Sequence, residues 1–226
     1  MSLSQLRQMS NKYGSNPEYV LAGGGNTSFK EDKILYIKGS GVSLANITED
    51  GFVKIDREKL KAIYSNTYSK DADEREAEVL ADMMDARMKG EENKRPSVET
   101  LLHDVYDFKF ILHIHPSRIN GMTCAKGWKK AFDKHFIKNS IWIEPIMPGY
   151  VLATVVKNEI DKFVKANKTL PLFIFLENHG VFIGGNDLNE IDKNMDTLNA
   201  AFDIEVKRTP DFSEVEFDED KAAALA

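Results

Sequence analysis

The sequence predicts a layered α/β domain in which helices cover a mixed or largely antiparallel β-sheet. Two observations support this: helical and strand-like segments interleave along the chain, and some strands are separated only by short turns. Residues 1–208 contain no linker rich in proline, glycine or serine and no internal repeat, so we expect a single domain. Residues 209–226 form an acidic C-terminal tail, which we expect to be frayed or packed on a neighbouring subunit.

The first half of the chain combines a glycine run with short strands and amphipathic helices. Apolar residues at helical spacing and turn residues between apolar runs place the boundaries. The expected elements are a helix over 3–13, strands over 19–21, 27–30 and 34–37 with a hairpin turn at 31–33, helices over 57–66 and 72–88, a solvated loop over 89–94, and a helix from just after Pro96 to about residue 107.

The second half begins with a strongly apolar strand that Pro116 ends. A second apolar run, Leu172 to Leu176, predicts another buried strand. The expected elements are strands over 109–115, 141–144, 172–177 and 181–183, and helices over 117–136, 150–166 and 187–206.

Composition narrows the class of protein. The 226 residues are 42% hydrophobic and 29% charged, which is ordinary for a globular protein. A net charge of −6 without a basic stripe argues against a nucleic-acid partner. No apolar run approaches the roughly 20 residues of a membrane span, and residues 1–7 do not resemble a secretory signal. The single cysteine, Cys124, excludes an internal disulfide, so we expect a cytoplasmic protein without a membrane partner.

Three histidines at predicted strand ends form the most informative pattern. Residues i and i+2 of a strand share a face, so His113 and His115 leave the same side of one strand. His179 follows the second buried strand and precedes a glycine. Three converging imidazoles suit a divalent metal with an open coordination position, as a catalytic site requires. Zinc is the first expectation, with Mn, Fe and Co as alternatives.

Glu99 has two interpretations from sequence. As a carboxylate in the first turn of a helix, with Ser97 as N-cap, it would favour the helix by ~0.3–1 kcal/mol. Beside a metal it would move a substrate proton. His103, one helical turn later, is expected to pack or hydrogen-bond rather than to bind metal. Both interpretations of Glu99 remain open at this point.

Two glycine-rich segments are candidate anion sites. Residues 23–28 and 39–41 follow or flank strands, and backbone N–H groups in such loops converge on anions. Residues 23–28 do not match the dinucleotide fingerprint, and either segment alone is also explained as a plain turn. If the fold brings them together, Asn26, Ser28, Ser40 and Ser97 form a phosphate pocket, to which Lys38 adds charge.

Five motifs in register resemble the class II aldolase/adducin family. They are Gly-Gly-Asn-Thr-Ser from residue 24, Lys-Gly-Ser-Gly from 38, Pro-Ser-Val-Glu from 96, His-x-His-Pro from 113 and Asn-His-Gly from 178. The best-known enzymes of the family are fuculose-1-phosphate and rhamnulose-1-phosphate aldolases and ribulose-5-phosphate 4-epimerase. The resemblance implies a three-layer α/β/α sandwich and a homotetramer with active sites at subunit contacts.

The resemblance also implies a chemistry. Zn²⁺ would be held by His113, His115 and His179, and Glu99 would ligate the resting metal and act as acid/base. Gly25, Asn26, Ser40, Gly41 and Ser97 match the phosphate-binding loops. The implied activity is that of a zinc-dependent aldehyde-lyase of carbohydrate metabolism. It would cleave a ketose 1-phosphate of the fuculose or rhamnulose type to dihydroxyacetone phosphate and an aldehyde, through a metal-bound enediolate.

Two departures from the family pattern leave the substrate open. Val98 stands where the family has a second serine, which removes one expected phosphate donor. The tyrosines that protonate the aldehyde side have no match, and no tyrosine follows Tyr150. The alternatives are a pentulose-phosphate 4-epimerase, although that enzyme has aspartate at the position of Glu99, and another metal-enediolate reaction such as decarboxylation or dehydration. An adducin-like non-catalytic module is a further alternative, which the retained histidines disfavour.

Overall fold

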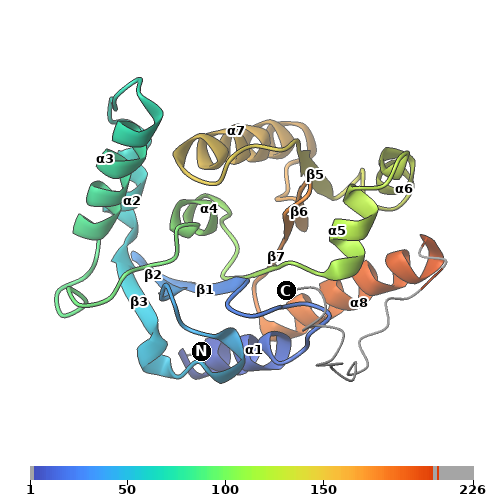
Figure 1. The fold of residues 1–226 in the computed structure, drawn as a ribbon, viewed down its shortest axis with the longest axis horizontal. Helices are drawn as coiled ribbons and strands as arrows, with labels where there is room; N and C mark the ends of the chain where they lie inside the picture. Colours follow the sequence, from blue (N-terminus) through green and yellow to red (C-terminus); the bar gives the residue numbers. More distant parts are fainter. Residues whose placement is uncertain (1–2, 206–207, 209–226) are drawn as a thin grey trace, which may run out of the picture.

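A seven-stranded β-sheet lies at the centre of the computed structural model, which describes residues 3–205 and residue 208 (Figure 1). The strand order is β3-β2-β1-β4-β7-β6-β5, and every neighbouring pair is antiparallel except β5–β6. This confirms the mixed, largely antiparallel sheet. The strands are β1 (Asn26–Glu31), β2 (Ile34–Lys38), β3 (Phe52–Asp56), β4 (Phe110–Ile114), β5 (Ser140–Ile143), β6 (Phe173–Leu176) and β7 (Gly180–Gly185).

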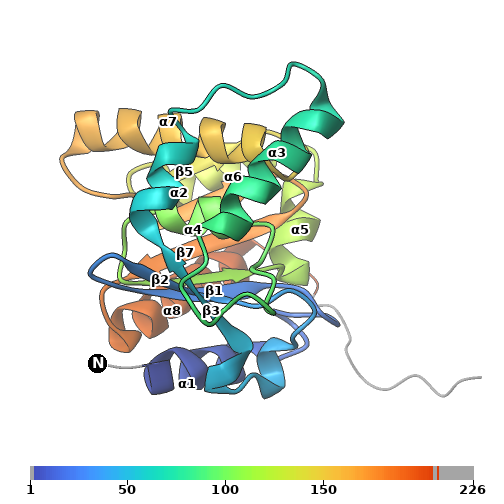
Figure 2. The same cartoon turned by 90° about the vertical axis from the view of Figure 1, so that its left-hand side faces the viewer.

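Helices cover both faces of the sheet and give the expected three layers. Figure 2 shows α1 and α8 on one side of the strands and α2, α3 and α7 on the other. One core cluster joins the sheet to α1 (Leu3–Gly14), α5 (Ser117–Thr123), α6 (Trp128–His135) and α8 (Leu188–Glu205). The other joins it to α2 (Arg57–Ile63), α3 (Ala72–Asp85), α4 (Thr100–Val105) and α7 (Tyr150–Asn167).

Alternation along β4 decides which layer the site faces. Phe110, Leu112 and Ile114 pack into the core cluster that includes α1 and α8, whereas Ile111 packs into the one that includes α4 and α7. His113 lies two residues after Ile111, so its side chain points toward α4. The sheet therefore presents this histidine to the helix that follows Glu99.

The strand prediction for the first half needs two corrections. Residues 19–21 form no strand, because the backbone N–H groups of Tyr19 and Val20 donate to Asn16 O, both at 3.0 Å, and close a turn after α1. Conversely, β3 was not predicted, although Val53 and Ile55 alternate inward and pair with β2. Two 3₁₀ turns, Leu44–Asn46 and Glu49–Gly51, lead into β3.

Two predicted helices are shorter than expected. The helix over 117–136 is divided into α5 and α6, because Gly127 adopts a left-handed conformation with φ +80°. The helix after Pro96 begins at Thr100, with Glu99 rather than Ser97 at its N-cap position. The predicted tail over 209–226 lies outside the described residues. In the part of the chain that the structure describes, no helix is long and apolar enough to cross a membrane.

Candidate metal centre

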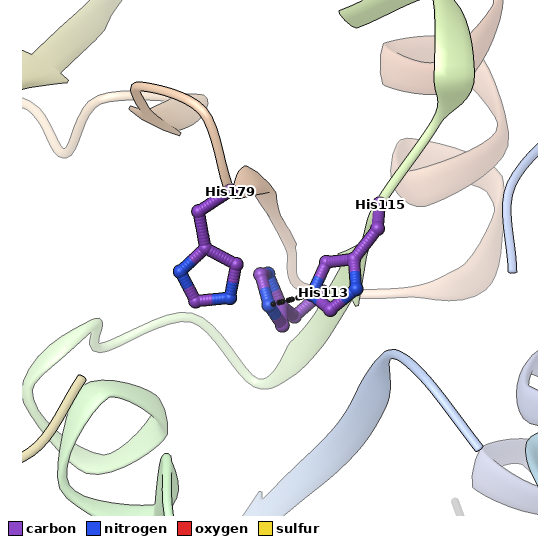
Figure 3. A group of neighbouring side chains, drawn as sticks. All are labelled: His113, His115 and His179. Atoms are coloured by element: carbon purple, nitrogen blue, oxygen red, sulfur yellow. Dashed lines mark hydrogen bonds between the residues drawn. The ribbon is translucent and has the colours of Figure 1, made fainter. Parts of the chain in front are cut away.

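The antiparallel pairing of β4 with β7 brings the three histidines together. His113 pairs with Phe182 and Ile114 with Val181, so the end of β4 and the start of β7 lie at the same edge of the sheet. His179 is presented just before β7 by Asn178, a left-handed residue with φ +58°. The potential ligand atoms of His113, His115 and His179 all lie within 4.8 Å of one another, and the rings face a common point (Figure 3).

Hydrogen bonding and burial prepare these imidazoles to accept a cation. His113 is fully buried, and its Nδ1 donates to Val181 O at 3.1 Å, which leaves the Nε2 lone pair facing the site. The Nε2 atoms of His113 and His115 are 2.9 Å apart. Burial, helped by the charge of His113, lowers the pKa of His115 to about 3, and burial also lowers the pKa of His179. Both rings are therefore neutral near pH 7, as metal ligation requires.

Glu99 supplies the fourth candidate ligand. Its Oε1 lies 3.3 Å from His113 Nε2 and 3.4 Å from His179 Nε2. Burial raises the pKa of Glu99, but the electrostatic interactions with both histidines and the hydrogen bond from Asn26 outweigh it and hold the pKa well below its ordinary value. The site therefore contains a buried carboxylate in contact with two imidazoles.

An orphaned oxygen tests whether these residues fit a metal. Among the described residues none hydrogen-bonds Glu99 Oε1, although the atom is fully buried. With Nδ1 of His113 donating elsewhere, a carboxylate oxygen and imidazole nitrogens face the same small space, where a bound cation would give the carboxylate oxygen a partner. Three imidazoles with a carboxylate beside them fit a divalent metal.

Asn26 belongs to the carboxylate rather than to the predicted phosphate pocket. Its Nδ2 donates to Glu99 Oε2 at 2.6 Å and to Ser97 Oγ at 3.1 Å, so both amide hydrogens have protein partners. Ser97 Oγ also accepts from the backbone N–H of Glu99 at 3.3 Å, and Ser97 O accepts from Thr100. The fold thus uses Asn26 and Ser97 to hold Glu99 before α4 begins.

The remaining predicted anion residues lie along the same edge. Residue 39 of the 39–41 loop forms a β-bridge with Pro96, Ser40 N donates to Arg95 O at 2.8 Å, and Ser97 N donates to Lys38 O at 3.1 Å. Lys38 is buried; burial lowers its pKa, and the charge of Glu99 partly offsets this. Ser40 and Gly41 are exposed, and among the described residues the Ser40 side chain makes no hydrogen bond. Gly25, with φ +68°, lies against His113 O.

A pocket of about 430 Å³ opens beside His179. Its wall is the 145–148 segment, in which Met147 is 84% exposed, together with Glu177 and Asn178. Glu177 accepts a hydrogen bond from Trp142 Nε1 at 3.2 Å. Sequence reasoning did not single out the 145–148 segment or Glu177, because the pocket exists only once the segment before α7 lies beside the end of β6.

Two further polar residues lie behind Glu99. His103 hydrogen-bonds Asn26 Oδ1 through Nε2, and its Nδ1 lies 2.7 Å from Ser28 Oγ. The expectation that His103 hydrogen-bonds rather than binds metal agrees with these contacts. Ser28 was grouped with the anion residues, but here it contacts His103; its spacing of two from Asn26 on β1 is the signal that both share a face.

Fold and site together define a three-layer α/β/α domain with a candidate metal centre at one sheet edge. The family model of the class II aldolase and adducin N-terminal domain matches residues 5–206, so the chain belongs to this family. Class II aldolases generally depend on a divalent metal, and family membership indicates an enzyme.

Individual relatives show the same relationship. The class II aldolase domain of a conserved protein from Thermoplasma acidophilum is 26% identical, with a TM-score of 0.74 over 91% of this chain and 94% of that one. L-fuculose-1-phosphate aldolase from Thermus thermophilus shares the fold at 16% identity, with a TM-score of 0.56 over 89% and 91% of the chains. The uncharacterized oxidoreductase YuxG of Bacillus subtilis (strain 168) is 26% identical over 81% of this chain, which spans only 26% of YuxG.

Proposed function

We propose that this chain is a zinc-dependent aldolase that cleaves a ketose 1-phosphate to dihydroxyacetone phosphate and an aldehyde. The observation that carries the proposal is the orphaned Oε1 of Glu99, buried within 3.4 Å of the imidazoles of His113 and His179. Family membership supports it, as does the fold shared with an enzyme named as a fuculose-1-phosphate aldolase. Zinc and the substrate class are part of the proposal.

Each residue then has a defined task. His113, His115, His179 and Glu99 would hold the ion, which when bound stabilises the negative charge that develops beside the substrate carbonyl as the carbon–carbon bond breaks. Asn26 fixes Oε2 of Glu99, so Oε1 would be the atom that leaves the ion when substrate binds and then exchanges a proton with the substrate carbon. The burial of Glu99 keeps water from competing for that proton.

Residues 38–41, which pair with the 95–97 segment, would hold the phosphate together with Ser97. Ser97 Oγ already accepts two hydrogen bonds, so its own hydrogen is free to donate to an anion. The backbone N–H of Gly41 and the hydroxyl of Ser40 face solvent, and Lys38 contributes positive charge. Fixing the phosphate in this way would place the reacting carbons at the metal.

A second candidate is another enediolate reaction on the same centre, including 4-epimerisation of a pentulose phosphate, decarboxylation or dehydration. The specific observation in its favour is Val98, an apolar side chain that is 58% exposed where the family has a phosphate donor. Trapping the released aldehyde with a coupled reductase separates cleavage from epimerisation, because an epimerase returns its aldehyde to the enediolate.

A homotetramer with active sites at subunit contacts is part of the same proposal. Exposed apolar side chains close to the candidate site support it: Val98, Met147 and Val151 are 58%, 84% and 41% exposed. Apolar groups clustered on a surface are typical of protein contacts. The molar mass of the purified protein in solution tests this part independently of the reaction.

The deciding experiment combines metal analysis with a substrate panel. We expect about one zinc per chain and aldehyde release from at least one 1-phosphorylated ketose. Glu99→Gln should lower that release by at least about 100-fold, because it removes the proton acceptor. His135→Ala, on α6 away from the centre, is the matched control and should leave zinc and activity unchanged. Bound zinc without cleavage of any ketose phosphate would contradict the aldolase and favour the second candidate.

A further inference from the structure

A fully buried chain of polar groups continues from Glu99 into the space between β1 and α4. Glu99 Oε2 accepts from Asn26 Nδ2, Asn26 Oδ1 meets His103 Nε2, and His103 Nδ1 meets Ser28 Oγ at 2.7 Å. His103 and Ser28 are completely inaccessible, and Asn26 is 5% exposed. Because buried polar groups need partners, each member restricts the orientation of the next.

The direction of every hydrogen bond in this chain follows from chemistry. The Asn26 NH₂ group donates to Glu99 Oε2, so its carbonyl oxygen Oδ1 faces His103 and can only accept there. His103 therefore carries its hydrogen on Nε2, and its Nδ1 accepts from the Ser28 hydroxyl.

We propose that His103 is a positioning residue that, as the Nε2–H tautomer set by Ser28, locks the Asn26 amide and thereby aims Glu99 Oε1 at the metal position. Without that donor, the Asn26 amide can rotate and turn its carbonyl oxygen toward the Glu99 carboxylate. Two acceptors would then face each other, and Glu99 would leave its fixed orientation. The inference rests on the proposed function for its catalytic consequence, but it concerns the carboxylate itself.

The contacts around His103 exclude a purely space-filling role. Its edge meets the Phe182 ring at a centroid distance of 5.3 Å, which an apolar side chain would also satisfy. Both ring nitrogens, however, are engaged with side chains of β1, and Asn26 Oδ1 is the atom opposite Nε2. Replacing the ring by an apolar group thus keeps packing but leaves a buried carbonyl oxygen without its donor.

Zinc affinity, measured by competition with a chromogenic chelator, tests the proposal without any substrate. His103→Leu should weaken Zn²⁺ binding by about 10- to 100-fold, the usual effect of removing a group that orients a ligand. His103→Gln, whose amide N–H can replace the donor to Asn26, should bind within about threefold of the parent. Ser28→Ala should weaken binding by less than His103→Leu. It removes the hydroxyl that favours the Nε2–H tautomer, but the imidazole can still donate to Asn26. His135→Leu is the matched control and should bind as the parent does.

A double-mutant cycle distinguishes positioning from a general structural defect. In a Glu99→Gln background either orientation of the Asn26 amide finds a partner, so adding His103→Leu should change Zn²⁺ affinity by less than about threefold. Equal losses in both backgrounds would overturn the proposal. Thermal unfolding of the metal-free proteins identifies any variant that fails to fold. If His103→Leu is such a variant, the Zn²⁺ affinities of Ser28→Ala and His103→Gln test the proposal instead.

The tautomer gives a second, spectroscopic test on the parent protein. Long-range ¹H–¹⁵N correlation spectra should show His103 as the Nε2–H form between pH 6 and 8, and an Nδ1–H form would overturn the proposal. Failure of the two inferences is distinguishable. A parent that binds zinc but cleaves no ketose phosphate loses the aldolase assignment alone, whereas unchanged zinc affinity in His103→Leu removes only the role of His103. A parent that binds no zinc loses both.

Discussion

The two walls of the candidate site are held in very different ways. On the metal wall, His113 is fully buried and Glu99 is 7% exposed, and their remaining polar atoms are fixed by Val181 O and Asn26. On the opposite wall, Met147 is 84% and Val98 58% exposed. Under the proposed function, the difference means that the groups at the metal position are held by the sheet, whereas the groups that would select the substrate are side chains that little else in the described chain restrains.

Removing a histidine of the metal wall should have the largest effect. His113→Ala takes away one of four ligands, and a quarter of the roughly 10–16 kcal/mol of a tetrahedral zinc site corresponds to about 100- to 1000-fold in affinity. Zinc titration by chelator competition measures this, with His135→Ala as the control. Retention of parental zinc affinity would mean that the ion is held elsewhere.

Substitutions at two glycines, Gly180 beside the histidines and Gly41 in the exposed loop, compare the two walls directly. A Cβ on Gly180 would lie 2.5 Å from Ile114 O and 2.7 Å from His115 Cδ2, so Gly180→Ala should cost about 1–3 kcal/mol of unfolding free energy and weaken zinc binding. Gly41 has φ +79° but open space around its Cβ position, so Gly41→Ala should cost about 1 kcal/mol and leave zinc binding unchanged. Urea unfolding and zinc titration of both variants measure these effects. An equal loss of zinc affinity in the two variants would contradict the difference between the walls.

Lys30 is a buried cation on the same face of β1 as Asn26 and Ser28. Its Nζ donates to Tyr106 O at 2.7 Å and Phe108 O at 3.0 Å. Burial lowers its pKa from 10.5 to about 7, with a partial offset from Asp104. Between these two values the unfolded chain carries a proton that the folded chain lacks, so stability should rise with pH there.

The slope contributed by Lys30 should reach at most about 1.4 kcal/mol per pH unit between about pH 7 and 10. Below pH 7 both states are protonated, and the cost of burying the charge is fully present. Lys30→Met should flatten this rise, as urea unfolding at pH 6, 7, 8 and 9 would show. An unchanged slope in the variant would assign the pH dependence to other groups.

The smallest effect is expected on the exposed wall. Val98→Ser should change the unfolding free energy by less than about 0.5 kcal/mol and leave zinc affinity unchanged. A hydroxyl at this position adds a possible phosphate donor, so KM for a phosphorylated substrate should fall by up to about tenfold, the value of one net hydrogen bond. Steady-state kinetics check this, with Val98→Ala as the control. A change in zinc affinity would show that the two walls are coupled.

The sequence was sufficient for the parts of the molecule that depend on local pattern. Alternation predicted that His113 and His115 share a face; His115 lies just after β4, and its Nε2 is 2.9 Å from that of His113. The fold class, mixed sheet and most elements followed from apolar spacing. Errors arose where local contacts override propensity, as at Tyr19, whose N–H closes a turn onto Asn16. The alternation of Val53 and Ile55 was a visible strand signal that we missed.

The roles of polar residues were harder to predict because they depend on tertiary contacts. Asn26 matched a phosphate loop, yet both hydrogens of its amide are donated to Glu99 and Ser97. Ser97 was expected to cap α4, but its hydroxyl accepts from the Glu99 backbone and from Asn26 instead. No sequence pattern specifies which partner a buried amide chooses once several lie within reach.

The direct pairing of β4 with β7 has a consequence for how such a domain can vary. The chain between these strands, which forms α5, α6, β5, α7 and β6, adds its two strands beyond β7 and never passes between the partners. The register of the ladder that sets the histidines therefore does not require a fixed length for the loops of that excursion. The sequence of the 145–148 segment, which lies in a loop of this excursion, can therefore change while His113 stays paired with Phe182.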